Sequence, residues 1–309
     1  MKEEGALSRT AVLLLAFGGP RSLDEVGWFL ERLLGKRPSP AQIEGLKRRY
    51  RSIGNASPLP EMTLRQARTL KERLKKGGQP LRVYVGMRYG HPLIAETLEE
   101  INKEKASRII LLSLSPYCSP FTSEGYYEEV KKVVALWKER MNFIQVDDWY
   151  AHPCLCAAWA KRIDKTLKEI SERGKEVPVI FTAHSLPLDA ASCTPYVGQL
   201  EETIKGIIET TGPLRWQLAF QSRARGGEWL GPEPETILEE LSQKGYKKAL
   251  IVPVGFICDH LETLYDLDIY LKAWANERGL EIIRVPCLND SPELIETLAH
   301  LVKGALERG

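Results

Sequence analysis

The 309-residue sequence has little that would direct it to a membrane or to a polyanion. No apolar run approaches the roughly 20 residues that span a bilayer, and the opening MKEEGALSRT contains no signal-peptide stretch. Neither sign of charge dominates, because 43 basic and 41 acidic residues leave a formal net charge of +2. A general attraction to nucleic acid is therefore excluded, and we expect a cytoplasmic protein.

Cysteine is also scarce, with six residues dispersed along the chain: Cys118, Cys154, Cys156, Cys193, Cys258 and Cys287. This dispersal in a chain without a signal peptide favours reduced thiols over a disulfide framework. Cys154 and Cys156 form an isolated C-x-C, whereas metal and iron–sulfur sites usually need four ligands at recognisable spacing. We therefore expect packing or surface thiols, with a cluster as the weaker alternative.

The familiar phosphate and hydrolase motifs are missing as well. The first apolar run ends in AFGGPR, which lacks the third glycine of a dinucleotide-binding G-x-G-x-x-G. The sequence contains no P-loop, no nucleophile elbow and no H-E-x-x-H. These absences disfavour nucleotide-binding enzymes, serine hydrolases and zinc proteases.

What the chain does have is a regular series of short apolar runs rich in β-branched residues, with helical stretches between them. These runs are residues 11–17, 82–86, 108–114, 143–146, 177–183, 215–220, 249–254 and 281–285. Such alternation is typical of βαβ units and of a parallel sheet. Four strands followed by four more predict an α/β protein with two similar halves.

The rhythm suggests a division into residues 1–155 and 156–309, with an amphipathic helix at 155–172 near the boundary. Residues 35–60 interrupt the first half and mix basic, aromatic, Gly and Pro residues, which predicts a structured loop forming a lip over a cleft. The last helix, 291–308, opens with S-P-E, an N-cap followed by an N1 proline. This helix belongs to the second half and could pack back on the first.

His184 closes the fifth apolar run, VPVIFTAHSLP. Ligands of open α/β sheets bind at the carboxyl ends of strands, and a neutral imidazole there can accept a proton or bind a metal. The alternative is a structural histidine that is hydrogen-bonded within a loop. His184 therefore needs supporting residues elsewhere in the chain.

The segment 252–270, VPVGFICDHLETLYDLDIY, supplies the best support. Asp259, Glu262 and Asp266 recur at i, i+3 and i+7, which places three carboxylates on one face of an α-helix. Glu262 and Asp266 are like charges four residues apart, an arrangement that favours a bound cation or proton. The alternatives are a capping box and a solvated acidic face.

Arginine and aromatic residues gather near other predicted strand ends. They include Arg49, Tyr50 and Ser57 in RRYRSIGNASPLP, Tyr117 in SLSPYCSPFTS, and the segment 220–232. Rings that cover a plane and guanidinium groups that bind carboxylates suit a flat apolar ligand with peripheral acids.

Together these segments resemble the ferrochelatases, which insert ferrous iron into a porphyrin in haem biosynthesis. The similarity extends from about Val12 to about Val302 and rests on five segments in family order: RRYRSIGNASPL, VGMRYGHP, AHSLP, QSR with WLGP, and VPVGFICDHLETLYDLD. It implies the type II chelatase architecture, two flavodoxin-like domains with four-stranded parallel sheets flanked by helices. A porphyrin cleft is expected between the domains, with residues 35–60 as its lip.

The resemblance also implies roles for individual residues. His184 and Glu262 would form the catalytic pair across the cleft, and both would join Asp266 as metal ligands. Iron enters only after two pyrrole N–H protons leave, which suits an imidazole acceptor and carboxylate oxygens. The implied porphyrin contacts are Phe17, Arg49, Tyr50, Ser57, Tyr117 and Tyr150.

Departures from the family pattern bear on the substrate. Coproporphyrin-using members often have a tyrosine where this chain has Phe17 and an arginine where it has Leu34, so protoporphyrin IX is favoured and coproporphyrin III comes next. Iron is expected as a substrate, and no cofactor is required. A 2Fe–2S cluster is not expected, although the internal cysteines leave it open. The alternative functions are a sirohydrochlorin cobalt or nickel chelatase and a haem or porphyrin carrier. Peripheral contact of residues 28–30 with a membrane stays open. The oligomeric state, monomer or homodimer, stays open as well.

Overall fold

A computed structural model describes residues 10–137, 141–170, 177–192, 194–224 and 226–308. Cys193, one of the expected thiols, lies outside these residues. The chain divides into two compact units. Unit 1 comprises Met1–Trp149 and Asn289–Gly309, and unit 2 comprises Tyr150–Leu288.

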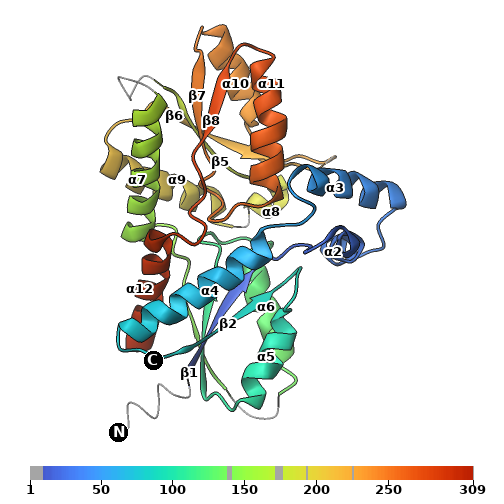
Figure 1. The fold of residues 1–309 in the computed structure, drawn as a ribbon, viewed down its shortest axis with the longest axis vertical. Coiled ribbons are helices and arrows are strands. Elements are labelled where there is room, and N and C mark those ends of the chain that lie inside the picture. Colours follow the sequence, from blue (N-terminus) through green and yellow to red (C-terminus); the bar gives the residue numbers. More distant parts are fainter. Residues whose placement is uncertain (1–9, 138–140, 171–176, 193, 225, 309) are drawn as a thin grey trace. The chain divides into compact units, whose positions relative to one another are not determined.

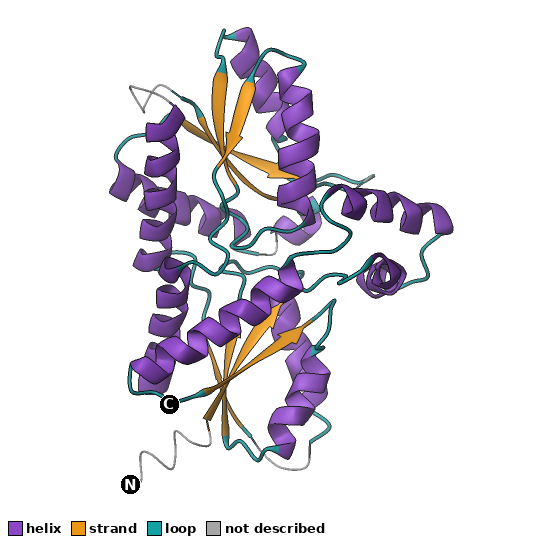
Figure 2. Ribbon diagram, in the orientation of Figure 1, coloured by secondary structure: helices purple, strands orange, loops and turns teal. Residues whose placement is uncertain are grey.

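Unit 1 is built around a parallel sheet whose strands alternate with helices (Figures 1 and 2). Its strands are β1 (Thr10–Ala16), β2 (Arg82–Met87), β3 (Arg108–Ser113) and β4 (Asn142–Gln145). Its helices are the 3-10 turn η1 (Leu23–Glu25), α2 (Val26–Leu34), α3 (Pro40–Ser52), α4 (Leu59–Lys76), α5 (Ile94–Lys103), α6 (Ser123–Val134) and α12 (Pro292–Arg308). The strand order β2-β1-β3-β4 reverses direction between β1 and β3.

Unit 2 repeats this plan with its own elements. Its strands are β5 (Val179–His184), β6 (Trp216–Gln221), β7 (Lys248–Val252) and β8 (Glu281–Arg284). Its helices are α7 (Pro153–Ile170), α8 (Leu188–Ser192), α9 (Tyr196–Thr211), α10 (Pro234–Gln243), the π-helix η2 (Glu262–Leu271) and α11 (Lys272–Asn276). The order β6-β5-β7-β8 reverses between β5 and β7, which is the place where such sheets bind ligands.

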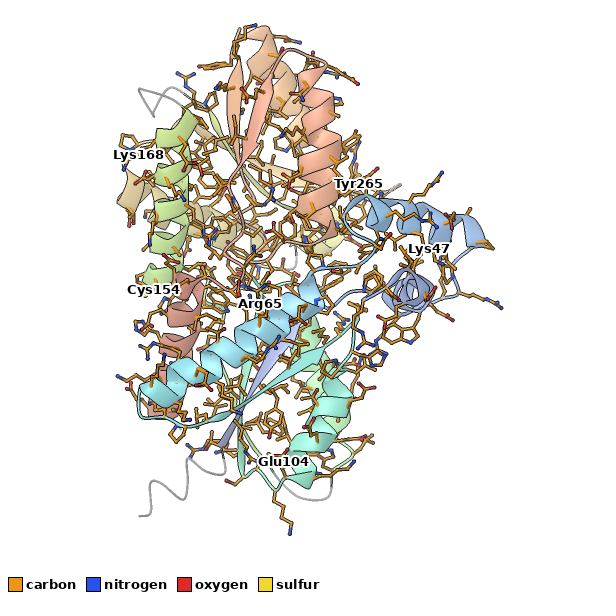
Figure 3. The ribbon with its side chains drawn as sticks, in the orientation of Figure 1. Lys47, Arg65, Glu104, Cys154, Lys168 and Tyr265 are labelled. Atoms are coloured by element: carbon orange, nitrogen blue, oxygen red, sulfur yellow. The ribbon has the colours of Figure 1, made fainter. Side chains whose placement is uncertain are left out.

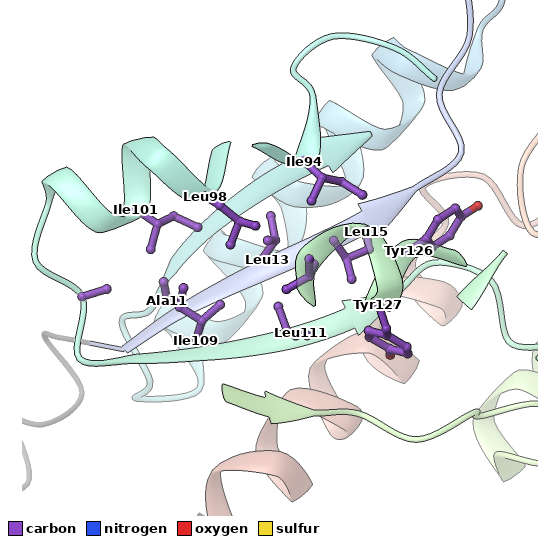
Figure 4. Packing of buried hydrophobic residues seen from close by; sticks show 12 residues of the cluster. Ala11, Leu13, Leu15, Ile94, Leu98, Ile101, Ile109, Leu111, Tyr126 and Tyr127 are labelled. Carbon is purple, nitrogen blue, oxygen red and sulfur yellow. The ribbon is translucent and has the colours of Figure 1, made fainter. Parts of the chain in front are cut away.

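In each unit, a central strand that is buried on both faces forms the core of the sheet. All seven residues of β1 are buried, and alternate residues Ala11, Leu13 and Leu15 pack on α5 and α6 in one apolar cluster (Figure 4). In unit 2, Ile180 of β5 packs with residues of α10 and η2 in the corresponding cluster. Continuous apolar strands of this kind are expected where helices cover both faces of a parallel sheet.

The two-sheet fold predicted from the sequence is confirmed. Both ends of each predicted strand lie within two residues of the ends of an observed strand. The last helix begins as expected, with the Ser291 hydroxyl accepting a hydrogen bond from the backbone N–H of Leu294 at 3.4 Å. Within the described ranges, no helix is both long enough and apolar enough to cross a bilayer.

Two details of the predicted organisation differ from the structure. The units separate between Trp149 and Tyr150, because α7 begins at Pro153 and a boundary at 155/156 would cut through its first turn. The last helix, α12, belongs to unit 1, where Arg73 of α4 contacts Glu296 through two hydrogen bonds of 2.6 and 2.7 Å.

The segment 35–60 is also more regular than a loop. Pro40–Ser52 forms the helix α3, because Ser39 and Gln42 make a reciprocal capping box and Pro40 occupies the first turn. The many basic residues in KRRYR obscured the helical periodicity of this segment in the sequence. Tyr50 is the residue of α3 that is buried. Whether this segment borders a porphyrin stays a prediction.

Candidate active site

The strongest constellation lies at the point where the sheet of unit 2 reverses. His184 is the last residue of β5, and its Nδ1 lies 2.8 Å from Oε2 of Glu262, the first residue of η2. Both residues belong to unit 2, so the expectation that they face each other across a cleft between the halves is wrong. They form a direct hydrogen bond, because β5 and β7 are neighbours and the segment after β7 returns over the end of β5.

Packing beneath His184 fixes its backbone. Residues 179–183 are buried, and the Tyr196 hydroxyl donates a hydrogen bond to the His184 carbonyl at 3.1 Å. The following Ser185 is fully buried, donates its N–H to the Gln221 carbonyl at 2.8 Å and its hydroxyl to the Leu230 carbonyl at 2.9 Å. The AHSLP segment therefore leaves the sheet along one defined path and presents the imidazole at its edge.

A glycine allows the segment after β7 to approach so closely. Gly255 donates its N–H to the carbonyl of Thr182 at 3.0 Å, and a Cβ added to Gly255 would lie 2.6 Å from Cβ of Ala183. Any side chain there would push the segment away from β5. The glycine in VPVGF thus explains how Glu262 reaches His184.

The pair is accessible and electrostatically coupled. The side chains of His184 and Glu262 are 35% and 30% exposed, so solvent or a ligand can reach them. Burial favours the neutral imidazole, but the charge and hydrogen bond of Glu262 outweigh it, and the pKa of His184 is raised. Burial likewise favours the protonated Glu262, but the charge and hydrogen bond of His184 prevail and lower the pKa of Glu262.

The acidic row predicted on one α-helical face has a different geometry. The helix begins only at Glu262 and is a π-helix, so Asp259 precedes it. Each carboxylate has its own partner: Asp259 accepts from Arg284 Nη1 at 2.9 Å, Glu262 contacts His184, and Asp266 accepts from the Ser222 hydroxyl at 2.6 Å. These hydrogen bonds stabilise the charged carboxylates, which explains how like charges coexist within eight residues.

The end of β6 supplies two contacts that were not assigned a role from the sequence. Gln221 pairs in register with His184 and donates its side-chain amide to the Glu262 carbonyl at 2.9 Å. Ser222 adopts a left-handed backbone with φ of 62° and reaches Asp266. Such strain in a residue other than glycine is typical of functional sites. The position of QSR at a strand end was the available signal.

His260 lies two residues before Glu262 and has another environment. Its ring packs edge to face on Phe256 at a centroid distance of 4.6 Å, and its Nδ1 is buried with no hydrogen-bond partner in the described part of the chain. Burial lowers the pKa of His260, which favours its neutral ring beside the His184–Glu262 pair.

In unit 1, two predicted porphyrin contacts lie near the ends of its own strands. Phe17 follows β1 and packs against the ring of Tyr89 at 4.7 Å. Ser57 donates its N–H to the Pro20 carbonyl at 2.8 Å, and a Cβ on Gly19 would lie 2.7 Å from Ser57. The structure therefore brings Phe17 and Ser57 to the same end of the sheet through the GG turn.

The remaining predicted contacts are less accessible or lie elsewhere. Tyr50 and Tyr117 are 3% and 1% exposed, so contact with a ligand would require either side chain to move. Arg49 is exposed on α3. Tyr150 is in unit 2, where its carbonyl accepts a hydrogen bond from the Thr203 hydroxyl at 2.8 Å.

Among the residues that the structure describes, the cysteines are not grouped as an iron–sulfur cluster would need. The five that the structure describes form no disulfide, and Cys154 lies in the first turn of α7 (Figure 3). Burial raises the pKa of Cys156 to about 11, which disfavours the thiolate that binds iron. Across the described ranges, no three His, Cys, Asp or Glu side chains are grouped so that they could hold a metal ion.

Comparison of folds places the chain among known chelatase structures. SirB from Bacillus subtilis with Fe3+ matches 96% of this chain and 95% of its own, with a TM-score of 0.59 and 13% identity. A second SirB structure, in complex with cobalt, gives a TM-score of 0.58 at 12% identity. At such low identity the similarity establishes the fold alone.

Sequence comparison is more specific. The ferrochelatase family model matches residues 9–306. A ferrochelatase from Herpetosiphon aurantiacus is 36% identical, with 96% of this chain and 99% of the relative aligned. One from Geotalea uraniireducens is 38% identical, with 95% and 97% aligned. The chain therefore belongs to the ferrochelatase family, the enzymes that insert ferrous iron into a porphyrin.

Proposed function

We propose that this chain inserts ferrous iron into protoporphyrin IX and that the His184–Glu262 pair carries out the proton transfer. The observation behind this proposal is the 2.8 Å contact between His184 Nδ1 and Glu262 Oε2 at the sheet reversal of unit 2. A carboxylate that accepts the Nδ1 proton fixes the imidazole tautomer and leaves the Nε2 lone pair as the base. The pair therefore has the parts required of a proton acceptor.

The reaction releases two protons for each ferrous ion that enters the porphyrin. His184 accepts a pyrrole proton, and the negative charge of Glu262 stabilises the resulting imidazolium. Asp266, held by Ser222 at 2.6 Å, offers a second carboxylate on the same helix for incoming iron or departing protons. Carboxylate oxygen and imidazole are suitable ligands for ferrous iron in passage, although these three described side chains are not grouped as a closed metal site.

Protoporphyrin IX is the porphyrin that the residues of unit 1 favour. Phe17 presents an aromatic ring without a hydroxyl that could bind the iron of the product. The exposed Leu34 offers apolar surface, 39% of it accessible, at a position where an arginine would bind an additional propionate. Coproporphyrin III, with four propionates, is therefore the second candidate.

The test is anaerobic incubation with ferrous iron and either porphyrin, followed by loss of porphyrin fluorescence. We expect turnover with protoporphyrin IX to exceed turnover with coproporphyrin III. His184→Ala should reduce insertion by about 1,000-fold because the proton acceptor is lost, while porphyrin binding persists. His300→Ala is the matched control, because His300 also contacts a glutamate, Glu296 at 3.2 Å, on the surface of α12.

No fluorescence loss with either porphyrin would exclude the proposed activity. Unchanged turnover in His184→Ala would remove His184 from the mechanism. A faster reaction with coproporphyrin III would reverse the substrate assignment. We propose no 2Fe–2S cluster, and absence of iron and of visible absorption in anaerobically purified protein is the expected result.

We also propose a peripheral contact with a membrane surface through α2. Trp28, Leu33 and Leu34 are 38%, 37% and 39% exposed on this helix, whereas Val26 and Phe29 face the interior. Co-sedimentation with anionic vesicles should weaken when Trp28, Leu33 and Leu34 are changed to Ser and persist in Phe121→Ser, an exposed aromatic elsewhere. Cytoplasmic location and a monomeric or homodimeric state remain predictions for fractionation and size-exclusion chromatography.

A further inference from the structure

Arg284, the last residue of β8, makes an ion-pair network whose role the sequence did not indicate. Its Nε and Nη2 donate to the two oxygens of Asp268 at 2.8 and 2.7 Å, and its Nη1 donates to Asp259 Oδ1 at 2.9 Å. The Arg284 side chain is only 12% exposed. One largely buried guanidinium thus binds two carboxylates.

The two carboxylates bracket the segment that carries the proposed chemistry. Asp259 precedes η2 and Asp268 lies in its second half, while Glu262 and Asp266 lie between them. Asp259 also accepts from the Thr263 hydroxyl at 3.2 Å, which links it to the first turn of the helix. Arg284 therefore joins both ends of the segment 259–268 to strand β8.

The opposite side of this segment is held by β6. Gln221 contacts the Glu262 carbonyl and Ser222 contacts the Asp266 carboxylate. Contacts from β6 fix the middle of the segment, and the contacts from β8 fix its ends. A π-helix has wider turns than an α-helix and is rarely stable without such tertiary support.

We propose that Arg284 is a positioning residue for iron insertion: by bridging Asp259 and Asp268 it holds η2 where the Glu262 carboxylate meets His184. This inference rests on the proposed function of the His184–Glu262 pair. Lysine could not replace Arg284 fully, because an ammonium group lacks the planar fork that binds one carboxylate twice and a second one at the same time.

A structural role alone must be separated from positioning, because removing one partner of a buried ion pair leaves uncompensated charges that destabilise the fold. The triple variant Arg284→Met, Asp259→Asn, Asp268→Asn removes the arginine together with both carboxylate charges. It should recover most of the thermal stability that Arg284→Met loses. It should not recover the rate, because the bridge is still missing.

The experiment measures kcat, KM for iron, KM for porphyrin and thermal unfolding in the full-length protein. We expect Arg284→Met and the triple variant to lower kcat by about 100-fold and Arg284→Lys by about 10-fold, with porphyrin KM unchanged. Arg278→Met is the matched control, because Arg278 also binds a carboxylate in unit 2, Glu239 at 3.0 Å, but contacts neither Asp259 nor Asp268. Its kcat should equal that of the wild type.

Wild-type kcat in Arg284→Lys, or recovery of kcat together with stability in the triple variant, would overturn the inference. Arg284→Lys and the triple variant keep the test decisive if Arg284→Met fails to fold. The proposed function fails separately, if His184→Ala and Glu262→Gln leave turnover unchanged. If those two variants lose activity and the Arg284 variants do not, only the positioning role is wrong.

Discussion

The two units have the same strand order but differ in the residues that follow their central strands. In unit 1 the sheet reverses between β1 and β3, where Phe17 and Tyr117 follow the strands. In unit 2 it reverses between β5 and β7, where His184 ends one strand and the segment to Glu262 follows the other. The same topological position is thus aromatic in one unit and ionisable in the other.

In both units a glycine allows another segment to approach the end of the central strand closely, but the approaching segments differ. A Cβ on Gly18 would lie 2.7 Å from the N atom of Gly90, so unit 1 brings the segment after β2 against β1. In unit 2, Gly255 brings the segment after β7 against Ala183 of β5. Only the second arrangement carries a carboxylate over the reversal point. The comparison indicates that one sheet topology can carry different side chains at its strand ends, because these depend on the last strand residues and on the connecting segments.

The largest effect is expected in unit 2, from Glu262→Gln. The amide keeps the size of the side chain but loses the charge that stabilises the imidazolium of His184, so insertion should slow by about 100-fold to 1,000-fold. Single-turnover kinetics with ferrous iron measure the loss, and quenching of porphyrin fluorescence checks that binding is retained. Equal rates for Glu262→Gln and the wild type would show that the ionisable reversal point has no special role.

Matched core substitutions test whether the two units are stabilised independently. Leu13→Ala on β1 and Ile180→Ala on β5 each remove a fully buried side chain from a central strand, at an expected cost of about 2–5 kcal/mol. Hydrogen exchange should show loss of amide protection mainly in the unit that carries the change. Equal loss in both units would show that they unfold as a single cooperative body.

The pH dependence of stability should also differ between the units. The raised pKa of His184 contributes stability that is lost as pH rises through that pKa, and the lowered pKa of Glu262 contributes stability that is lost as pH falls through it. Since both side chains are partly exposed, the contribution should be below about 1 kcal/mol. Denaturant titrations at several pH values should show that His184→Gln abolishes the loss on the alkaline side.

A similarly small effect is expected at the aromatic reversal point. Phe17→Leu keeps an apolar side chain but removes the ring that packs on Tyr89, so KM for porphyrin should rise a few-fold, about 1 kcal/mol, with kcat unchanged. Phe121→Leu, an exposed ring after β3, serves as control. A fall in kcat equal to the rise in KM would mean that unit 1 takes part in the chemical step.

Local patterns in the sequence were sufficient for the sheets, and they marked His184 and Glu262 as candidates that the resemblance to the ferrochelatases then paired. The apolar runs predicted the strands because residues buried on both faces of a sheet must be apolar, and His184 was found because it interrupts such a run at its end. The spacing of acidic residues marked Glu262 together with Asp259 and Asp266, and the resemblance singled it out. These patterns are local, so they can be recognised without knowledge of tertiary contacts.

Features that depend on tertiary contacts were missed or misplaced. The π-helix has no sequence period of its own, and its Asp259 and Asp268 acquire their meaning only beside Arg284 of β8. The membership of α12 in unit 1 depends on contacts with α4, which lies more than 200 residues earlier. No pattern within a single segment could have indicated either.

The return of α12 to unit 1 determines the order in which the chain can mature during synthesis. Unit 2 is one continuous stretch, Tyr150–Leu288, whereas unit 1 needs Asn289–Gly309 to complete its packing. As the ribosome works from the amino end, every residue of unit 2 is made before the helix that bears Glu296 can meet Arg73. Unit 1 therefore begins before unit 2, and α4 meets its partner α12 only after every residue of unit 2 has been made.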